Sequence, residues 1–234
     1  MKKILFLLAS LSVVAMLAGC DGKDTVPDSG AGTDEGQGTE DPGVPEEPST
    51  AEYAVGDYYD EGFVKGIVFN VDEAGEHGYV MSLDETVAVW SYRNESVMDG
   101  TPSSDGKYNT GCVQLMSDWQ EYYPGFAWAE QKNVMGLDNW YVPSSYEMTL
   151  IYTAYTGHEP GISETDEDTD AKEWFNACIT AHGGTPLRDV LYWTSGELGP
   201  QIAYVFDMTI GTNNLTQSLV YKSNEYPFRA ISRF

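Results

Sequence analysis

Few residues in this 234-residue chain have the type and spacing needed for catalysis or metal binding. The three histidines, His77, His158 and His182, form no H-x-x-x-H or H-E-x-x-H motif, which would place two metal ligands on one helix face. Ser195 lies in YWTSGE, which lacks the G-x-S-x-G motif of a nucleophile elbow. We therefore expect no zinc site, and we interpret Ser195 as a surface or core-capping serine.

Three acids alternate in the stretch DEDTD, at Asp166, Asp168 and Asp170. Calcium is held by several carboxylate oxygens, so these acids are candidate ligands. An EF-hand loop beginning at Asp166 would place Ala171 and Ala177 where the loop requires glycine and glutamate. Acids also suit the start of a helix, where the dipole favours negative charge. We interpret the run as a helix-capping cluster, keep calcium as the alternative, and expect no other cofactor.

The first twenty residues, MKKILFLLASLSVVAMLAGC, combine two lysines with an apolar run from Ile4 to Leu17 and small residues before Cys20. The run is shorter than the roughly 20 apolar residues of a bilayer-spanning helix, so it predicts a secretory signal peptide. The segment LAGC at 17–20 resembles the lipobox of bacterial lipoproteins, in which cleavage precedes a lipidated cysteine. The resemblance implies a signal peptide over residues 1–19 and lipidation of Cys20. It also implies an outer-membrane lipoprotein of a Gram-negative bacterium, facing the cell surface or the periplasm.

Two further cysteines, Cys112 and Cys178, lie 66 positions apart on predicted helices. In an oxidising compartment they are candidates for a disulfide bond. The bond requires Cα atoms about 4.4–6.8 Å apart, a distance that the sequence does not give. A disulfide and two buried free thiols are therefore both open.

Residues 21–50 contain no aromatic residue and carry nine acids against a single base, Lys23. Such a segment buries too little apolar surface to offset its chain entropy, so we predict a disordered tether over residues 20–52. Residues 51–234 contain 28 acids and 9 bases, a net charge of −19. Proteins that bind nucleic acid contact phosphates mainly through Lys and Arg. The charge therefore excludes nucleic acid as an expected partner.

Residues 53–234 contain strand and helix patterns that predict one folded domain. Ile67-Val68-Phe69 and Tyr79-Val80-Met81 are short β-type runs that we expect to pair. The pattern Ser144-x-x-Glu147 has the spacing of a capping box and predicts a helix over residues 145–155 that ends at Gly157. Its apolar positions should form a single buried stripe: Met148, Ile151, Tyr152 and Tyr155.

Other segments complete the predicted order. Asn109 or Thr110 is expected to cap a helix whose apolar stripe includes Cys112, Val113, Leu115 and Met116. A second helical turn is expected after Pro124, and a third helix over residues 167–181. Strand-like segments follow at residues 190–195, 201–208, 217–222 and 228–234. The order of strands, helices and strands predicts an α+β domain with mostly antiparallel short strands and two to three helices.

This order, together with NWYVPSSYEM, YWTSGE, FRAISRF and GIVFNVDEAGEHGYVMSLDE, resembles the Lcl-type family, named after the C-terminal part of a collagen-like adhesin. The likeness covers most of residues 56–234 and implies a C-type-lectin-like fold, which formylglycine-generating enzymes share. Those enzymes hold copper through neighbouring cysteines near the end of the domain, and this chain lacks them. Sugar-binding lectins carry Glu-Pro-Asn or Gln-Pro-Asp beside calcium, where this chain has Glu159-Pro160-Gly161.

Tyrosines are frequent in segments predicted as loops, and rigid aromatic rings suit sugar stacking or a protein interface. The candidates for a binding surface are Tyr58, Tyr59, Tyr122, Tyr123 and Tyr226. The sequence therefore indicates a non-catalytic adhesion module on a tethered lipoprotein, with a glycan or a protein as ligand. The alternatives are a structural part of a pilus or nutrient-capture complex, and an enzyme related to the formylglycine generators.

Overall fold

The computed structural model describes residues 53–137, 139–161, 166–209 and 217–234. The predicted signal peptide, the lipidation of Cys20 and the predicted tether over residues 20–52 all lie outside these residues. Within the described ranges, no helix is both long and apolar enough to cross a membrane. Residues 47–234 belong to one compact unit.

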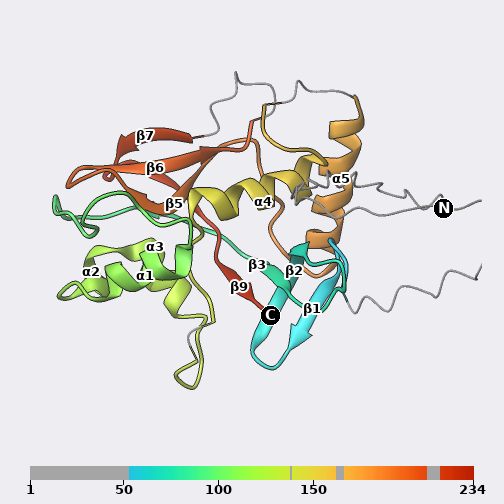
Figure 1. Cartoon of the computed structure of the whole chain (residues 1–234), viewed down its shortest axis with the longest axis horizontal. Coiled ribbons are helices and arrows are strands. Elements are labelled where there is room, and N and C mark those ends of the chain that lie inside the picture. Colours follow the sequence, from blue (N-terminus) through green and yellow to red (C-terminus); the bar gives the residue numbers. More distant parts are fainter. Residues whose placement is uncertain (1–52, 138, 162–165, 210–216) are drawn as a thin grey trace, which may run out of the picture. The chain divides into compact units, whose positions relative to one another are not determined.

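The described chain is α+β, as the element order predicts (Figure 1). Four strands come first: β1 (Tyr58–Glu61), β2 (Val64–Val71), β3 (Gly78–Ser82) and β4 (Thr86–Val89). Five helices follow in the described ranges: α1 (Gly106–Gln114), α2 (Trp119–Tyr122), α3 (Pro124–Glu130), α4 (Ser145–Thr156) and α5 (Asp166–Ala181). The last strands are β5 (Leu191–Glu197), β6 (Ile202–Asp207), β7 (Gln217–Tyr221), β8 (Glu225–Phe228) and β9 (Ile231–Arg233).

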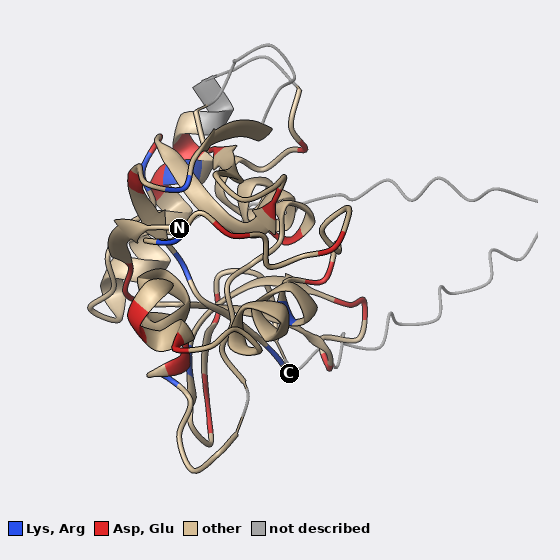
Figure 2. Ribbon diagram, turned by 90° about the vertical axis from the view of Figure 1, so that its left-hand side faces the viewer, with Lys and Arg blue, Asp and Glu red and all other residues tan. Residues whose placement is uncertain are grey.

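The strands form three antiparallel sheets with the orders β1-β2-β3-β9, β4-β8 and β5-β6-β7. The last strand thus returns to the first sheet, where Tyr79 of β3 is opposite Arg233 of β9. In Figure 1, α4 runs between the β5-β6-β7 sheet and α5, while α1, α2 and α3 lie together below that sheet. Acidic residues are spread over many loops and helices of the unit, and Lys and Arg occupy few places (Figure 2).

Two groups of buried side chains form the core. One lies among α1, α3, β4 and β5 and includes Trp90 and Trp193. The Trp90 indole N–H donates to the Thr194 carbonyl (2.9 Å), and the Trp193 indole N–H donates to that of Ala88 (3.0 Å). These reciprocal bonds satisfy two buried polar groups and tie β4 to β5. The second group packs α4 and α5 against β2 and includes Phe175.

The structure confirms the predicted helix at 145–155 and its capping box. The Ser144 hydroxyl accepts the Glu147 N–H (3.1 Å), and the Glu147 carboxylate accepts the Ser144 N–H (2.9 Å). The four stripe residues are all at most 3% exposed. Gly157 ends the helix with φ of 82°, a left-handed conformation that glycine adopts without strain.

The prediction for the helix near residue 110 was wrong at its start. The N-cap is Asp105, whose carboxylate accepts the N–H groups of Lys107 and Tyr108. Asn109 lies inside the helix, and its side chain bonds Ser103 and Ser195 instead. Leu115 is 86% exposed, so it does not belong to the buried stripe. The pattern also missed β1, β4, β8 and α2, and the described helices number five instead of the two to three expected.

Candidate functional site

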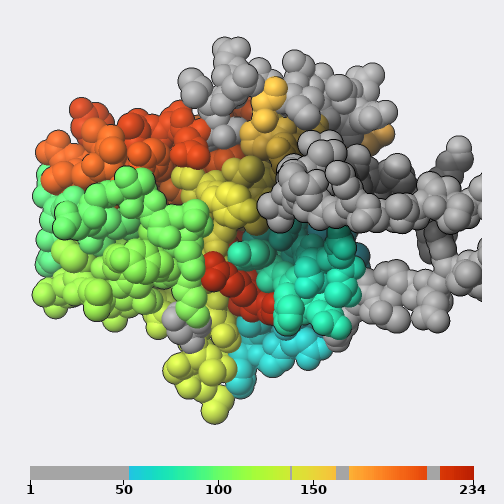
Figure 3. All heavy atoms as spheres, in the orientation of Figure 1, coloured from blue at the N-terminus to red at the C-terminus, as the bar shows by residue number. Residues whose placement is uncertain are grey.

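A surface hollow of about 360 Å³ lies where the β2–β3 turn meets the C-terminal strand β9. Its lining combines amide, acid, imidazole, guanidinium and aromatic groups: Asn70, Val71, Asp72, His77, Gly78, Tyr79, Arg233 and Phe234. Figure 3 shows the red end of β9 exposed on the surface between the teal β2–β3 segment and the green and yellow segments. We call this hollow, with the polar contacts of Arg233, the Arg233 site.

The strands hold the walls of the site in register. Gly78 and Phe234 exchange backbone hydrogen bonds of 3.2 and 3.1 Å, which closes the ladder between β3 and β9. A Cβ atom on Gly78 would lie 2.3 Å from the Asn70 carbonyl oxygen and 2.9 Å from the Phe234 ring. Glycine is therefore required here for the close approach of two strands and an aromatic side chain. The Asp72 carboxylate accepts the Glu76 N–H (3.1 Å) and so fixes the turn that carries His77.

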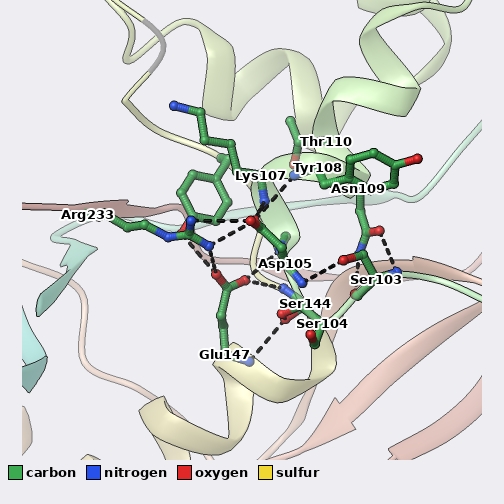
Figure 4. A network of polar contacts seen from close by, with 12 residues as sticks. Ser103, Ser104, Asp105, Lys107, Tyr108, Asn109, Thr110, Ser144, Glu147 and Arg233 are labelled. Carbon is green, nitrogen blue, oxygen red and sulfur yellow. Dashed lines mark hydrogen bonds and ion pairs between the residues drawn. The ribbon is translucent and has the colours of Figure 1, made fainter.

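Arg233 connects the hollow to two helix starts (Figure 4). Its guanidinium donates to both Asp105 carboxylate oxygens (2.8 and 3.3 Å) and to Glu147 Oε1 (3.0 Å). The guanidinium carbon also lies 5.4 Å from the ring centres of Tyr79 and Tyr141. Burial lowers the pKa of Arg233, but its bonds to Asp105 and Glu147 outweigh this and raise that pKa above its usual value. The guanidinium is therefore a fixed positive charge at the rim.

Glu147 fixes the inner side of this network and is 1% exposed. One carboxylate oxygen accepts the N–H groups of Gly106 and Ser144 (both 2.9 Å). The other accepts the Tyr141 hydroxyl (2.9 Å) and the Arg233 guanidinium. Burial, together with the Glu147 charge, raises the pKa of Tyr141, so its hydroxyl stays a donor. Four donors surround the carboxylate, which compensates for its removal from water.

The outer side of the network is open to solvent. The side chains of Asp105 and Arg233 are 43% and 40% exposed, so each can still contact a ligand. Partial burial raises the pKa of Asp105, but the bond from Arg233 outweighs it, and that pKa lies below its ordinary value. A fixed acid and a fixed guanidinium beside Tyr79 can bind a ligand with hydroxyl groups and an apolar ring face.

The structure does not bring the predicted binding tyrosines together. Tyr58 stacks on His182 with ring centres 4.0 Å apart, and Tyr122 lies 3.5 Å beneath the Arg93 guanidinium. Tyr226 packs edge-on against Trp193 in the first core group. Tyr123 was wrongly assigned to the surface: it is completely buried, and its hydroxyl donates to Glu95 (2.9 Å).

Tyr59 alone among these five packs on a residue of the hollow. Its ring centre lies 4.7 Å from that of Phe234, which lines the Arg233 site.

The sequence reasoning missed Asp105, Tyr79 and Arg233 as site residues. Tyr79 carried a signal, since a tyrosine in a strand between apolar neighbours presents its polar end at a surface. Asp105 and Arg233 lie 128 residues apart, so no local pattern indicated their contact.

The remaining candidate residues are spread over the unit. Ser195 was interpreted as a surface or core-capping serine; it is completely buried and accepts a hydrogen bond from the Asn109 amide (3.1 Å), so the core alternative holds. The described residues contain no cluster of three His, Cys, Asp or Glu that would suit a metal ion. The side chains of Asp166 and Asp168 lie outside the described part, so the calcium alternative is untested there.

The disulfide alternative does not hold in the structure, where Cys112 and Cys178 are both free thiols. The reason is their placement: α1, which carries Cys112, contributes to the first core group, and Cys178 packs against the second. Burial raises the pKa of the Cys178 thiol and thereby disfavours its reactive thiolate.

The chain resembles known proteins in structure and not in sequence. No family model matches the chain, and no curated protein matches it in sequence. A fimbrial protein from Bacteroides ovatus, solved by crystallography, is similar over 67% of this chain, with 18% identity and a TM-score of 0.48. The match covers 36% of that protein, so this chain corresponds to about a third of its length.

Proposed function

We propose that the protein is a membrane-anchored lipoprotein whose body is a non-catalytic, C-type-lectin-like binding module, and that its ligand is a glycan bound at the Arg233 site. The observation that carries the proposal is the guanidinium of Arg233, held by Asp105 and Glu147 at the rim of a hollow lined by Tyr79 and Phe234. Groups fixed before binding lose little entropy when a ligand arrives.

The composition of the hollow favours a glycan over an apolar ligand. Asn70, Asp72 and His77 offer donors and acceptors for hydroxyl groups, and the rings of Tyr79 and Phe234 offer apolar faces. A volume of about 360 Å³ is near the lower end of ligand pockets and suits a small part of a longer chain. A protein ligand is the second alternative for this site.

We also propose that the protein is not an enzyme, since the side chains that could act in catalysis are buried and already hydrogen-bonded. The Glu147 carboxylate is surrounded by four donors, and the Ser195 hydroxyl is buried beside Asn109. A general acid or base requires reach to a substrate proton, which these buried side chains lack. Turnover of a bound glycan by the purified protein would contradict this part.

The test of the binding site compares two exposed histidines. The protein is screened on a glycan array, and the best ligand is titrated by calorimetry with and without calcium. We expect saturable binding that His77→Ala weakens by about tenfold, equivalent to 1.4 kcal/mol, and that His182→Ala leaves unchanged. His182 is a matched control because it stacks on Tyr58, away from the residues that line the hollow. Equal affinities of the two variants would refute the site.

The membrane anchor is proposed from the sequence alone. If Cys20 carries the lipid, Cys20→Ala should move the protein from the detergent-extracted membrane fraction to the soluble or unprocessed one. A variant that is cleaved normally and still sediments with the outer membrane would contradict the anchor.

A role in a surface assembly is a second candidate function, and it is favoured by a separate observation at strand β7.

A further inference from the structure

Strand β7 (Gln217–Tyr221) is an edge of the β5-β6-β7 sheet. Its residues 217–221 lie opposite residues 206–202 of β6, and the Lys222 N–H donates to the Gln201 carbonyl (2.8 Å). In an antiparallel ladder, hydrogen-bonded positions alternate. Positions 218, 220 and 222 therefore face β6, and the backbone groups of 217, 219 and 221 point away from it. Among the described residues, none bonds the outward N–H and C=O of Leu219.

The strand carries none of the features that protect an edge. Its sequence, QSLVY, has no charged residue, proline or glycine, whereas edge strands are commonly blocked by lysine or proline. Leu219 and Tyr221 are 46% and 62% exposed. They lie on the outer face of the sheet beside their cross-strand neighbours Tyr204 and Ile202. An apolar strip thus adjoins the outward groups of Leu219, which no described residue bonds, whereas the outward C=O of Tyr221 accepts the Asn224 N–H (2.9 Å).

We propose that β7 pairs antiparallel with β7 of a second copy of this chain. With Leu219 opposite its counterpart, the two Leu219 residues exchange N–H to C=O bonds, and the Tyr221 N–H of each copy meets the Gln217 C=O of the other. The Tyr221 C=O takes no part, because it accepts the Asn224 N–H. The pairing is self-complementary and extends the three-stranded sheet to six strands across a twofold axis. Because no position of QSLVY is charged, no like charges meet in the ladder. The proposal is independent of the Arg233 site.

A second copy of this chain suits the uncharged strand β7 better than a positively charged strand of another protein does. A partner chosen by charge would be basic, because the chain carries a net charge of −25, but β7 and its flanks offer few acids to hold such a strand. The same net charge opposes pairing of two copies at low salt. Salt screens this repulsion, as the Debye length falls from about 10 Å at 0.1 M to about 3 Å at 1 M. Self-association should therefore strengthen with salt, whereas association of opposite charges weakens.

The test is sedimentation equilibrium of the purified protein from about 1 µM to about 1 mM, the range of weak and moderate affinities. We expect a monomer–dimer equilibrium that tightens between 0.1 and 1 M NaCl. Leu219→Pro removes the outward N–H and no bond to β6, so it should abolish the dimer. Leu219→Thr keeps that N–H and is the matched control, which should still dimerise. Circular dichroism verifies that both variants fold.

Hydrogen exchange gives a second measurement that needs no variant. In the dimer, the amides of Leu219 and Tyr221 should be protected at high protein concentration and exposed at low concentration. A wild-type chain that stays monomeric throughout, or protection of these amides that does not change with concentration, would overturn the proposal. So would a folded Leu219→Pro variant that associates as the wild type does. Protection of the same amides by added basic peptides without self-association would assign the edge to a foreign strand instead.

Discussion

The Arg233 guanidinium lies 3.0 Å from the Glu147 carboxylate, although the two residues are 86 positions apart. Glu147 caps the start of α4, and its other carboxylate oxygen accepts the N–H of Gly106 at the start of α1. One side chain therefore joins two helix starts to the C-terminal strand. A capping box usually stabilises only the start of its own helix. Here its Glu147 also orients Arg233 in the proposed binding site.

This double role predicts unequal effects of two substitutions in the capping box. Ser144→Ala should lower the free energy of unfolding by about 1 kcal/mol, because the Glu147 N–H loses its acceptor. Glu147→Gln should lower the free energy of unfolding by about 3–5 kcal/mol, because Arg233 loses its buried partner. The new amide NH2 group would also face donors that now bond the carboxylate. Urea unfolding followed by tryptophan fluorescence measures both. A Glu147→Gln variant as stable as Ser144→Ala would show that the carboxylate serves the cap alone.

Asp105 predicts a specific loss of stability in acid. Its pKa in the folded protein lies below the ordinary value of 3.8, since the bond from Arg233 outweighs the opposing effect of burial. As the pH falls below about 4, the unfolded chain takes up the proton first, so the stabilising contribution of Asp105 is present above this range and lost below it. The stability difference between wild type and Asp105→Asn should therefore shrink between about pH 6 and about pH 3. A difference that stays constant would contradict the ion pair. Asp60→Asn, in the exposed pair with Lys65, is the surface control.

The parts of the fold that the sequence predicts are those with a local cause. The helix α4 was predicted from Ser144 and Glu147 because a capping box needs only residues three positions apart. Strands β2 and β3 were predicted from apolar runs that one turn joins. The start of α1 was misplaced because Asn109 and Asp105 are both good N-caps, and tertiary bonds from Asn109 to Ser103 and Ser195 decide between them.

The Arg233 site could not be predicted from the sequence, because its residues are far apart along the chain. Its groups come from the β2–β3 turn, the start of α1, the start of α4 and β9, and only the return of β9 to β3 brings them together. Strands β4 and β8 were missed for a similar reason, because each has four residues and is defined by pairing with the other across more than a hundred positions. Pairing between short distant segments leaves no periodic pattern to detect.

The buried pair of Lys222 and Glu197 predicts a large loss of stability when one of its charges is removed. Both side chains are 1% exposed and in contact, and the ammonium lies 4.4 Å from the Trp90 ring centre. Burial lowers the pKa of Lys222, against the opposing effect of Glu197. Lys222→Met leaves a buried carboxylate without its cation and should cost about 3–5 kcal/mol, measured by urea unfolding.

The matched control for this substitution is Lys65→Met. Lys65 and Asp60 also form an ion pair (2.9 Å), but their side chains are 57% and 45% exposed, so Lys65→Met should change the stability little. Combining Lys222→Met with Glu197→Gln should recover part of the stability, since no net charge remains buried. A Lys222→Met variant no less stable than Lys65→Met would contradict the buried pair.

Two helix glycines predict opposite effects of the same substitution. Gly111 in α1 faces open space, so Gly111→Ala should raise the free energy of unfolding by about 0.5–1 kcal/mol through the higher helix propensity of alanine. In α3, a Cβ atom on Gly125 would lie 2.3 Å from the Phe228 ring, which is completely buried. Gly125→Ala gains the same propensity but forces that ring away from Phe126 and Trp193, and overpacking of this kind costs about 1–3 kcal/mol. Thermal unfolding of the two variants beside the wild type measures both effects. If Gly125→Ala proved as stabilising as Gly111→Ala, α3 would not pack on β8 through this glycine.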